Sequence, residues 1–336
     1  MVTGGMRHAG IAAVAAFTMA ALAACGGGNG DDAGGSGDAG GDGDLTTIGF
    51  VAVGPEGAWR NANEQNVQDT FTKEAGFDLK YAPAANLDQK SQIDAFTAFV
   101  DEGVDLILLS ATEATGWEDS LQRAQEAEIP VILVDRGIEP DDTSLYVTRL
   151  APNNVAVAAN IANWLVDNHP EGGEYITIEG PAGVGVVDER NQGFDEVISK
   201  HPEWVKVGAQ TANWAVDEGK SVTETFLKSN PDLKFVFAQN DEMGLGASEA
   251  VLEAGKTVGP DGVLIATIDG TKNAMTALSE GRLSFVAEYN PLFGDQLLDA
   301  VKKALAGEDQ PSSIEVTSTT FDSPEAAKAA LPDRKY

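Results

Sequence analysis

Basic residues are scarce in this sequence. The 336 residues include 22 Lys and Arg against 53 Asp and Glu, which gives a formal net charge of −31 at pH 7. Proteins that bind nucleic acid, or dock on an anionic membrane surface, need clustered Lys and Arg, and no such cluster occurs here. The composition therefore argues against both kinds of partner. Hydrophobic residues still make up 43% of the chain, enough for about two packed domains.

Cysteine and histidine are almost absent. Cys25 is the only cysteine, so the chain cannot form an internal disulfide. Beyond the N-terminal segment the only histidines are His169 and His201, and each precedes a proline. No cluster has metal-ligand spacing, and neither a G-x-S-x-G nor a G-x-x-x-x-G-K motif is present. The sequence therefore predicts a protein that is not an enzyme and that carries no metal or cofactor.

No hydrophobic run is long enough to cross a membrane. The most apolar stretch, residues 11–24, is shorter than the ~20 residues of a spanning helix and follows Arg7, as in a signal peptide. It ends in Leu-Ala-Ala-Cys, which resembles the lipobox of bacterial lipoproteins. We therefore predict a lipoprotein signal peptide over residues 1–24 and lipidation of Cys25. Alternatively, the chain is a plain secreted protein and Cys25 is incidental.

The residues after Cys25 are dominated by Gly and Asp up to residue 44. Such a composition predicts a flexible, self-repelling linker, and we assign residues 25–45 to the lipidated cysteine and this linker. A calcium loop is the alternative, but the segment lacks the fixed ligand spacing and the closing Glu of such loops.

From residue 45 onward, short β-branched runs alternate with longer helical patterns. Strands are predicted at 47–53, 78–81, 106–109, 131–134, 175–178, 205–209, 235–238, 263–268 and 284–287. Helices are predicted over 58–75, 88–102, 114–128, 152–168, 186–200, 216–229, 241–254, 271–280 and 291–306. Near-continuous apolar strands are typical of parallel sheets that are buried on both faces. About nine or ten strands fit two sheets better than one, and the series divides near 149–153 without a flexible linker. We therefore expect an α/β protein of two hinged domains with a cleft between them.

Polar side chains follow nearly every predicted strand, where ligands of open α/β sheets bind. Arg60, Arg136 and Arg190 all lie at such positions. Carboxylate, amide and guanidinium groups together suit a neutral polyhydroxyl ligand, whose hydroxyls both donate and accept hydrogen bonds. Trp59 and Trp214 offer flat apolar faces for a sugar ring.

Structural interpretations of these residues stay open. Asp135 and Arg136 could form an ion pair with each other, Asn240 and Asp269 could cap helices, and Trp59 could belong to the core. The other tryptophans of the body are interpreted as packing residues: Trp117, Trp164 and Trp204.

Several of these strand-end segments match a known family. They are Val-Asp-Arg at 134–136, Glu-Arg-Asn-Gln-Gly-Phe at 189–194, Phe-Ala-Gln-Asn-Asp-Glu-Met at 237–243 and Ile-Asp-Gly-Thr at 268–271. Over residues 46–320 the sequence resembles the periplasmic-binding-protein type I sugar receptors of ABC importers, the ribose- and galactofuranose-binding group. Gly-Ala-Trp-Arg at 57–60 and Thr-Gly-Trp-Glu at 115–118 look most like the galactofuranose branch, since ribose receptors usually carry Phe at the position of Trp59.

The resemblance implies two doubly wound parallel-sheet lobes joined by a three-segment hinge near 149–151, 288–290 and 310–313. One lobe would comprise residues 46–149 plus 289–311, the other residues 150–288 plus 312–336. Trp59 and Trp214 would sandwich the sugar. The family also implies hydrogen bonds to its hydroxyls from Asp135, Arg136, Arg190, Asn240 and Asp269.

Three further residues complete the expected ligand-binding set. Glu56 and Arg60 follow the galactofuranose pattern, and Glu288 falls where ribose receptors carry Gln.

The function implied by the family is that of a monomeric substrate-binding lipoprotein on the outer face of the bacterial cell membrane. It would deliver a monosaccharide to the permease subunits of an ABC importer. A galactofuranose-like furanose is the first choice, with ribose or another pentose or hexose next. The alternatives are a sugar sensor that presents its ligand to a signalling receptor, a secreted lipoprotein hydrolase, and a lactose-repressor-type regulator. The last would need a basic helix-turn-helix ahead of the body, where this chain has an acidic linker.

Overall fold

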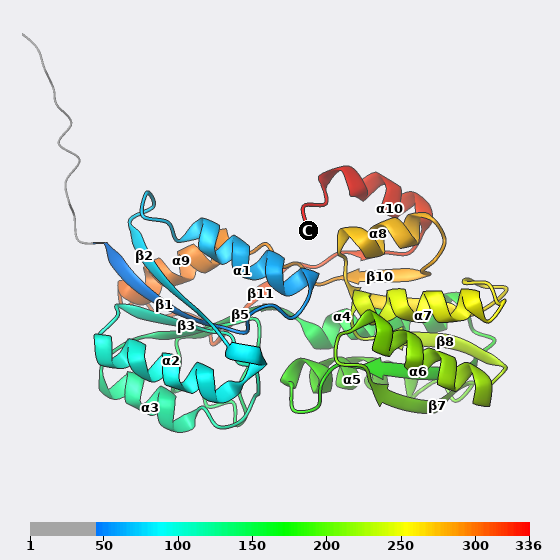
Figure 1. Cartoon of the computed structure of the whole chain (residues 1–336), viewed down its shortest axis with the longest axis horizontal. Helices are drawn as coiled ribbons and strands as arrows, with labels where there is room; N and C mark the ends of the chain where they lie inside the picture. Colours follow the sequence, from blue (N-terminus) through cyan, green and yellow to red (C-terminus); the bar gives the residue numbers. More distant parts are fainter. Residues whose placement is uncertain (1–44) are drawn as a thin grey trace, which may run out of the picture. The chain divides into compact units, whose positions relative to one another are not determined.

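The computed structural model describes residues 45–336 (Figure 1). The predicted signal peptide, the lipidation of Cys25 and the linker lie outside these residues. No helix in the described range is both long and apolar enough to span a membrane.

The first lobe is built on a six-stranded sheet whose strands all pair in parallel. Its strand order is β11 (Ser313–Val316), β5 (Thr148–Pro152), β4 (Val131–Val134), β3 (Leu106–Leu109), β1 (Thr46–Ala52) and β2 (Phe77–Pro83). The helices of this lobe are α1 (Ala58–Thr70), α2 (Gln89–Glu102), α3 (Glu118–Glu126) and α9 (Gly294–Leu305).

Both faces of this sheet are buried, which explains its continuous apolar strands. In β3, Leu106 and Leu108 belong to the core cluster that contains residues of α1 and α9. Ile107 and Leu109 belong to a second cluster with residues of α2 and α3. Alternate side chains of one strand therefore serve two cores, as expected for a covered parallel sheet.

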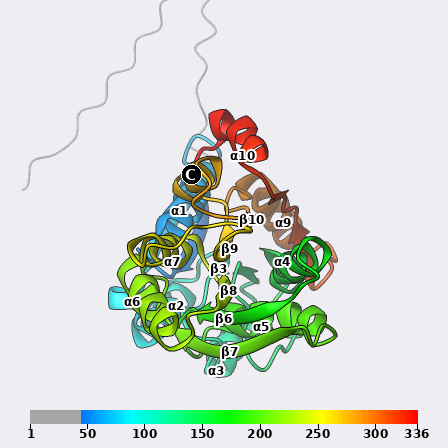
Figure 2. The same cartoon turned by 90° about the vertical axis from the view of Figure 1, so that its right-hand side faces the viewer.

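The second lobe repeats this plan. Its strand order is β12 (Thr320–Phe321), β10 (Phe285–Glu288), β9 (Leu264–Asp269), β8 (Leu233–Ala238), β6 (Gly173–Glu179) and β7 (Trp204–Thr211). Only β12 pairs antiparallel. Its helices are α4 (Asn154–Asn168), α5 (Gly185–Ile198), α6 (Val216–Ser229), α7 (Asp241–Glu253), α8 (Lys272–Ser279) and α10 (Pro324–Ala330). Figure 2 shows α6 and α7 on one side of this sheet and α4 and α5 on the other.

Within residues 45–336 the chain passes between the sheets three times, and the observed boundaries differ from the expected ones. The passages lie between β5 and α4, between β10 and α9, and between β11 and β12. β5 pairs with β4, so the first lobe extends to residue 152 rather than 149. β11 pairs with β5 and also belongs to the first lobe, although residues 312–336 were assigned to the second. The sequence prediction missed β11 because it is a short edge strand with mostly exposed residues, which carries little hydrophobic pattern. It missed β5 because this short strand, Thr-Arg-Leu-Ala-Pro, includes an arginine and a proline and has no continuous apolar run.

Candidate functional site

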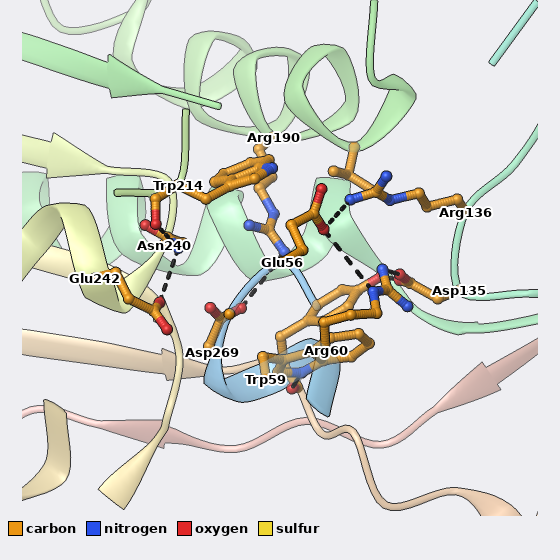
Figure 3. Close-up of a pocket in the computed structure, with 13 residues that line it drawn as sticks. Glu56, Trp59, Arg60, Asp135, Arg136, Arg190, Trp214, Asn240, Glu242 and Asp269 are labelled. Carbon is orange, nitrogen blue, oxygen red and sulfur yellow. Dashed lines mark hydrogen bonds and ion pairs between the residues drawn. The ribbon is translucent and has the colours of Figure 1, made fainter. Parts of the chain in front are cut away.

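A cavity lies between the two lobes, at the carboxyl ends of their strands (Figure 3). It comprises about 420 Å³ of space, including the part that opens to solvent. Its residues come from the β1–α1 turn and the first turn of α1, the two residues after β4, α5, the β7–α6 loop, the start of α7, the end of β9 and the residue after β10. The lining residues are Glu56, Gly57, Trp59, Arg60, Asp135, Arg136, Val186, Arg190, Trp214, Asn240, Glu242, Asp269 and Tyr289.

Two buried ion pairs form the side of the cavity that belongs to the first lobe. We call Glu56, Arg60, Asp135 and Arg136 the first-lobe wall. Arg60 donates to Asp135, and Arg136 donates to Glu56. Burial disfavours the charge on each carboxylate, but the neighbouring guanidinium groups outweigh it and lower the pKa of both Glu56 and Asp135. Both carboxylates of this wall are therefore ionised at neutral pH.

The opposite side holds one cation among several acids. We call Arg190, Asn240, Glu242 and Asp269 the second-lobe wall. Arg190 Nη2 lies 3.8 Å from Asp269 Oδ1, longer than a hydrogen bond. Its Nε donates to Asn154 Oδ1 at 2.9 Å, and its Nη1 donates to a backbone carbonyl. Burial, together with nearby acids, raises the pKa of Asp269 well above its usual range despite Arg190. This carboxyl therefore tends toward its neutral form.

A further buried acid, Asp241, lies beneath the second-lobe wall. Its carboxylate accepts hydrogen bonds from Thr267 Oγ1 at 2.6 Å, and from Thr271 N and Oγ1 at 2.6 and 2.8 Å. Burial raises its pKa to about 7 in spite of these bonds. By holding Thr271, Asp241 fixes the turn that follows Asp269.

Aromatic rings complete the cavity. Trp59 and Tyr289 lie with ring centroids 5.2 Å apart, and Tyr289 Oη donates to Asp135 Oδ1 at 2.7 Å. The guanidinium of Arg190 lies over the rings of Tyr289 and Trp214, at 4.9 and 5.6 Å from their centroids. Cation–π contacts of this kind hold a guanidinium in place without using all its N–H donors.

Several donors at the cavity are buried but have no hydrogen-bond partner within the described part of the chain. They are Arg60 Nε, Arg136 Nε and Trp214 Nε1. Buried donors are normally satisfied, so these unpartnered groups leave the residues around the cavity with unused hydrogen-bond donors.

Strained backbone also gathers at the cavity. Asp135, Trp214 and Asp269 have φ values of 67°, 60° and 129°, a region that favours glycine. Such conformations cost free energy and are concentrated at functional sites, where the surrounding structure enforces them.

The structure brings nine of the ten expected ligand-binding residues to this cavity; the exception is Glu288. The Glu288 carboxylate instead accepts from Arg334 and, at 3.0 Å, from Tyr336 Oη. Successive residues at a strand end point to opposite sides, so Glu288 turns toward the C-terminal segment and Tyr289 toward the cavity.

Tyr289, Glu242, Gly57 and Val186 line the cavity but were not predicted to do so. Glu242 stands in the strand-end segment 237–243 and Tyr289 directly follows Glu288, so the neighbours of the expected residues in the sequence include both.

The structural interpretations that stayed open can now be compared with the structure. Trp59 belongs to a core cluster and also lines the cavity. Asn240 does cap α7, accepting from Met243 N at 2.9 Å, and it also faces the cavity. Asp269 is not a cap, because Thr271 caps α8. Asp135 and Arg136 are both in ion pairs, but with partners other than each other. The tryptophans interpreted as packing residues are Trp117 and Trp204, which are buried, and Trp164, which packs against the core.

Comparison with known proteins gives consistent matches. A family model described as the periplasmic binding protein domain matches residues 48–309. The fructose import binding protein FruE of Bifidobacterium longum is 46% identical over 321 residues, which cover 94% of each protein. The galactofuranose-binding protein YtfQ of Escherichia coli is 34% identical, covering 86% of this chain and 91% of that protein. A crystal structure from Mycobacterium smegmatis in complex with β-D-fucofuranose aligns with a TM-score of 0.81 and 40% identity, covering 87% of this chain and 96% of that one.

Proposed function

The chain belongs to the periplasmic binding protein domain family, and we propose that it is the substrate-binding protein of a carbohydrate ABC importer, with a neutral monosaccharide in furanose form as its ligand. Family membership confirms the resemblance seen in the sequence and the fold of two parallel-sheet lobes. Members of this family are binding proteins rather than enzymes, in agreement with the sequence prediction.

The charge balance of the cavity is the observation that carries this proposal. Three guanidinium groups face four carboxyl groups, and burial drives the Asp269 carboxyl toward its neutral form. The lining therefore favours a ligand that has no net charge. The unpartnered donors on Arg60, Arg136 and Trp214 favour a ligand with several oxygen acceptors, and the carboxylates favour hydroxyl donors. A monosaccharide meets all these conditions.

The furanose ring form is supported by relatives with related ligands. Two of the relatives are named for fructose and galactofuranose, and the similar crystal structure from Mycobacterium smegmatis is a complex with β-D-fucofuranose. Fructose readily forms a furanose ring, and fucofuranose is galactofuranose without the hydroxyl on C6. Trp59 of the first lobe and Trp214 of the second lobe then cover the apolar faces of the ring. We place a galactofuranose-like furanose first, with ribose or another pentose or hexose next.

Binding occurs by closure of the two lobes. Three passages of the chain form the hinge, at 152–154, 289–293 and 317–319. A ligand shifts this equilibrium only if it binds the closed form better, and residues of both lobes line the cavity. The closed, loaded form is the one that the permease accepts.

The protein acts as a monomer on the outer face of the cell membrane, held by a lipid on Cys25. The lipobox-like residues 22–25 and the Gly- and Asp-rich composition of residues 26–44 support this anchor. Substitution of Cys25→Ser should release the protein into the medium with its sugar affinity unchanged. Retention of the variant in the membrane fraction would contradict lipid anchoring.

The decisive experiment is a thermal-shift screen of residues 46–336 against neutral monosaccharides, including D-fructose, D-galactose, D-fucose, L-arabinose and D-ribose. A ligand that binds only the folded state should stabilise it by about 2.7 kcal/mol at 100 times its Kd. Arg136→Ala and Asp269→Ala are the matched site variants, and each should weaken binding by roughly 2 kcal/mol or more, because a sugar hydroxyl that is buried in the closed cavity loses its hydrogen-bond partner. A shift with an amino acid or nucleoside but with no sugar would disprove the proposed function.

A further inference from the structure

The N-terminus of α1 has no capping side chain from its own segment of the chain. Its N-cap residue is Gly57, which has no side chain to accept a hydrogen bond, and no acidic residue stands in the first turn. The first N–H groups of a helix lack partners inside the helix and are usually satisfied by a side chain just before it. In α1 the same turn carries Trp59 and Arg60, both of which line the cavity.

The missing acceptor comes from the other lobe. Glu242, in the first turn of α7, accepts from Ala58 N through Oε1 at 3.0 Å. Its other oxygen, Oε2, accepts from Asn240 Nδ2 at 2.8 Å within its own lobe. One carboxylate therefore joins the N-terminus of α1 to a cavity-lining amide of the second lobe. Because the N-terminus of a helix carries partial positive charge, an ionised carboxylate suits this place.

Gly57 allows this approach. A Cβ added to Gly57 would lie 3.2 Å from Glu242 Oε1, tighter than ordinary packing. The backbone of Gly57 is extended, with φ of 167°, so a residue with a side chain could adopt it. Close approach of Glu242, rather than backbone conformation, is therefore the reason for glycine at this position.

We propose that Glu242 is a positioning residue that caps α1 across the cleft when the lobes close and so holds Trp59 and Arg60 against the ligand. This inference rests on the proposed function. Glu242 belongs to the second lobe and Ala58 to the first, so separation of the lobes breaks their hydrogen bond while the Glu242–Asn240 bond remains. The cap is a contact of the closed form only, and its loss should speed ligand release more than it slows ligand capture.

The test compares Glu242→Ala and Glu242→Gln with the wild type, in the full chain carrying Cys25→Ser. The matched control is Glu249→Ala, which removes a carboxylate from the exposed side of the same helix. Affinity and rate constants are measured by tryptophan fluorescence with D-fructose, D-galactose, D-fucose and L-arabinose. Glu242→Ala should raise Kd and the dissociation rate constant about tenfold, and Glu242→Gln about threefold, because the amide oxygen still accepts from Ala58 N. The association rate constant should change less than twofold, and Glu249→Ala should behave as the wild type.

The panel also separates positioning from direct contact. A positioning role predicts the same fold loss for every sugar that binds, whereas a hydrogen bond from Glu242 to one hydroxyl predicts no loss for the sugar that lacks it. An unchanged dissociation rate constant in Glu242→Ala, or a loss confined to particular sugars, would overturn the proposal.

A second measurement is independent of the sugar assignment. Hydrogen exchange of the Ala58 amide should be at least tenfold faster in Glu242→Ala than in the wild type when a sugar holds the lobes closed, and the difference should be smaller in the sugar-free protein, where the closed form is only part of the population. If no sugar binds the wild type, the proposed function fails while the difference that remains in the sugar-free protein still decides the role of Glu242. Equal exchange in the two proteins under every condition would refute the cap.

Discussion

The two walls of the cavity handle buried charge in different ways. In the first-lobe wall each carboxylate has its own guanidinium partner, Arg60 for Asp135 and Arg136 for Glu56. In the second-lobe wall Arg190 lies 3.8 Å from Asp269, and the carboxyl groups of Glu242 and the underlying Asp241 lie close to Asp269 as well. In the first-lobe wall each carboxylate is thus paired with a guanidinium group, whereas in the second-lobe wall some of the carboxyl groups are protonated and uncharged.

This difference gives the two walls opposite responses to pH. A carboxyl whose pKa is lowered in the folded state contributes stability above its unfolded pKa, and this is lost as pH falls. Glu56 and Asp135 are of this kind. A carboxyl whose pKa is raised favours the folded state while it is protonated, and this contribution is lost as pH rises. Asp241 and Asp269 are of this kind. The first wall is therefore weakened by acid and the second by rising pH.

The largest effect is expected when the first-lobe wall loses the guanidinium group of Arg60. Arg60→Met should reduce the free energy of unfolding by about 3–5 kcal/mol at pH 7, because a buried Asp135 is left ionised beside an apolar side chain. Arg190→Met is the matched variant, since Arg190 is 4% exposed and Arg60 3%. It should cost less, because Asp269 can remain protonated. Urea unfolding of the sugar-free proteins measures both values, and an equal or larger loss in Arg190→Met would contradict the comparison.

The second-largest effect is expected in the pH dependence of the free energy of unfolding. The pKa of Asp241 is about 7 in the folded protein against about 3.8 when unfolded, so the folded state holds the extra proton between these values. The free energy of unfolding should therefore fall as pH rises from about 4 to about 7. Asp241→Asn keeps the side chain neutral and should remove much of this slope.

Urea unfolding at intervals from pH 4 to pH 8 measures the slope. Asp217→Asn, at an exposed position in the first turn of α6, is the matched control and should keep the wild-type slope. A slope that Asp241→Asn leaves unchanged would mean that other groups set the pH response.

The same contrast shows what sequence reasoning could reach. The strand-end rule located Asp135, Arg136 and Asp269 because parallel strands bring their carboxyl ends together. The strand-end rule could not predict the ion-pair partners of these residues. Asp135 and Arg136 are adjacent in sequence, but each forms an ion pair with a residue of the β1–α1 region. Partner choice depends on side-chain direction across neighbouring strands, which residue spacing does not fix.

The strained backbone conformations at the cavity could not be predicted from the sequence either. Positive φ values occur at Asp135, Trp214 and Asp269, none of which is glycine. The residue types at these positions therefore gave no indication of the strained backbone.

The fold could be predicted more completely than the site. The predicted runs at 106–109 and 131–134 coincide with β3 and β4, because buried parallel strands have the clearest apolar pattern. The third hinge passage was expected near 310–313 and lies at 317–319, because β11 is a short edge strand whose mostly exposed side chains give no hydrophobic pattern.

The smallest expected effect tests whether the walls are also joined away from the cavity. Arg149 of the first lobe donates to Glu189 of the second through two hydrogen bonds, at 2.6 and 3.1 Å. Both side chains are partly exposed, so solvent screens the pair, and Glu189→Gln should weaken sugar binding by only about twofold to threefold. Because the pair joins the two lobes, the wild-type affinity should fall with salt while that of the variant falls less. Titrations at low and high ionic strength, with exposed Glu196→Gln of the same helix as control, measure the difference. If Glu189→Gln shows the wild-type salt dependence, the closed state depends on the cavity and on the cap at Glu242 rather than on this ion pair.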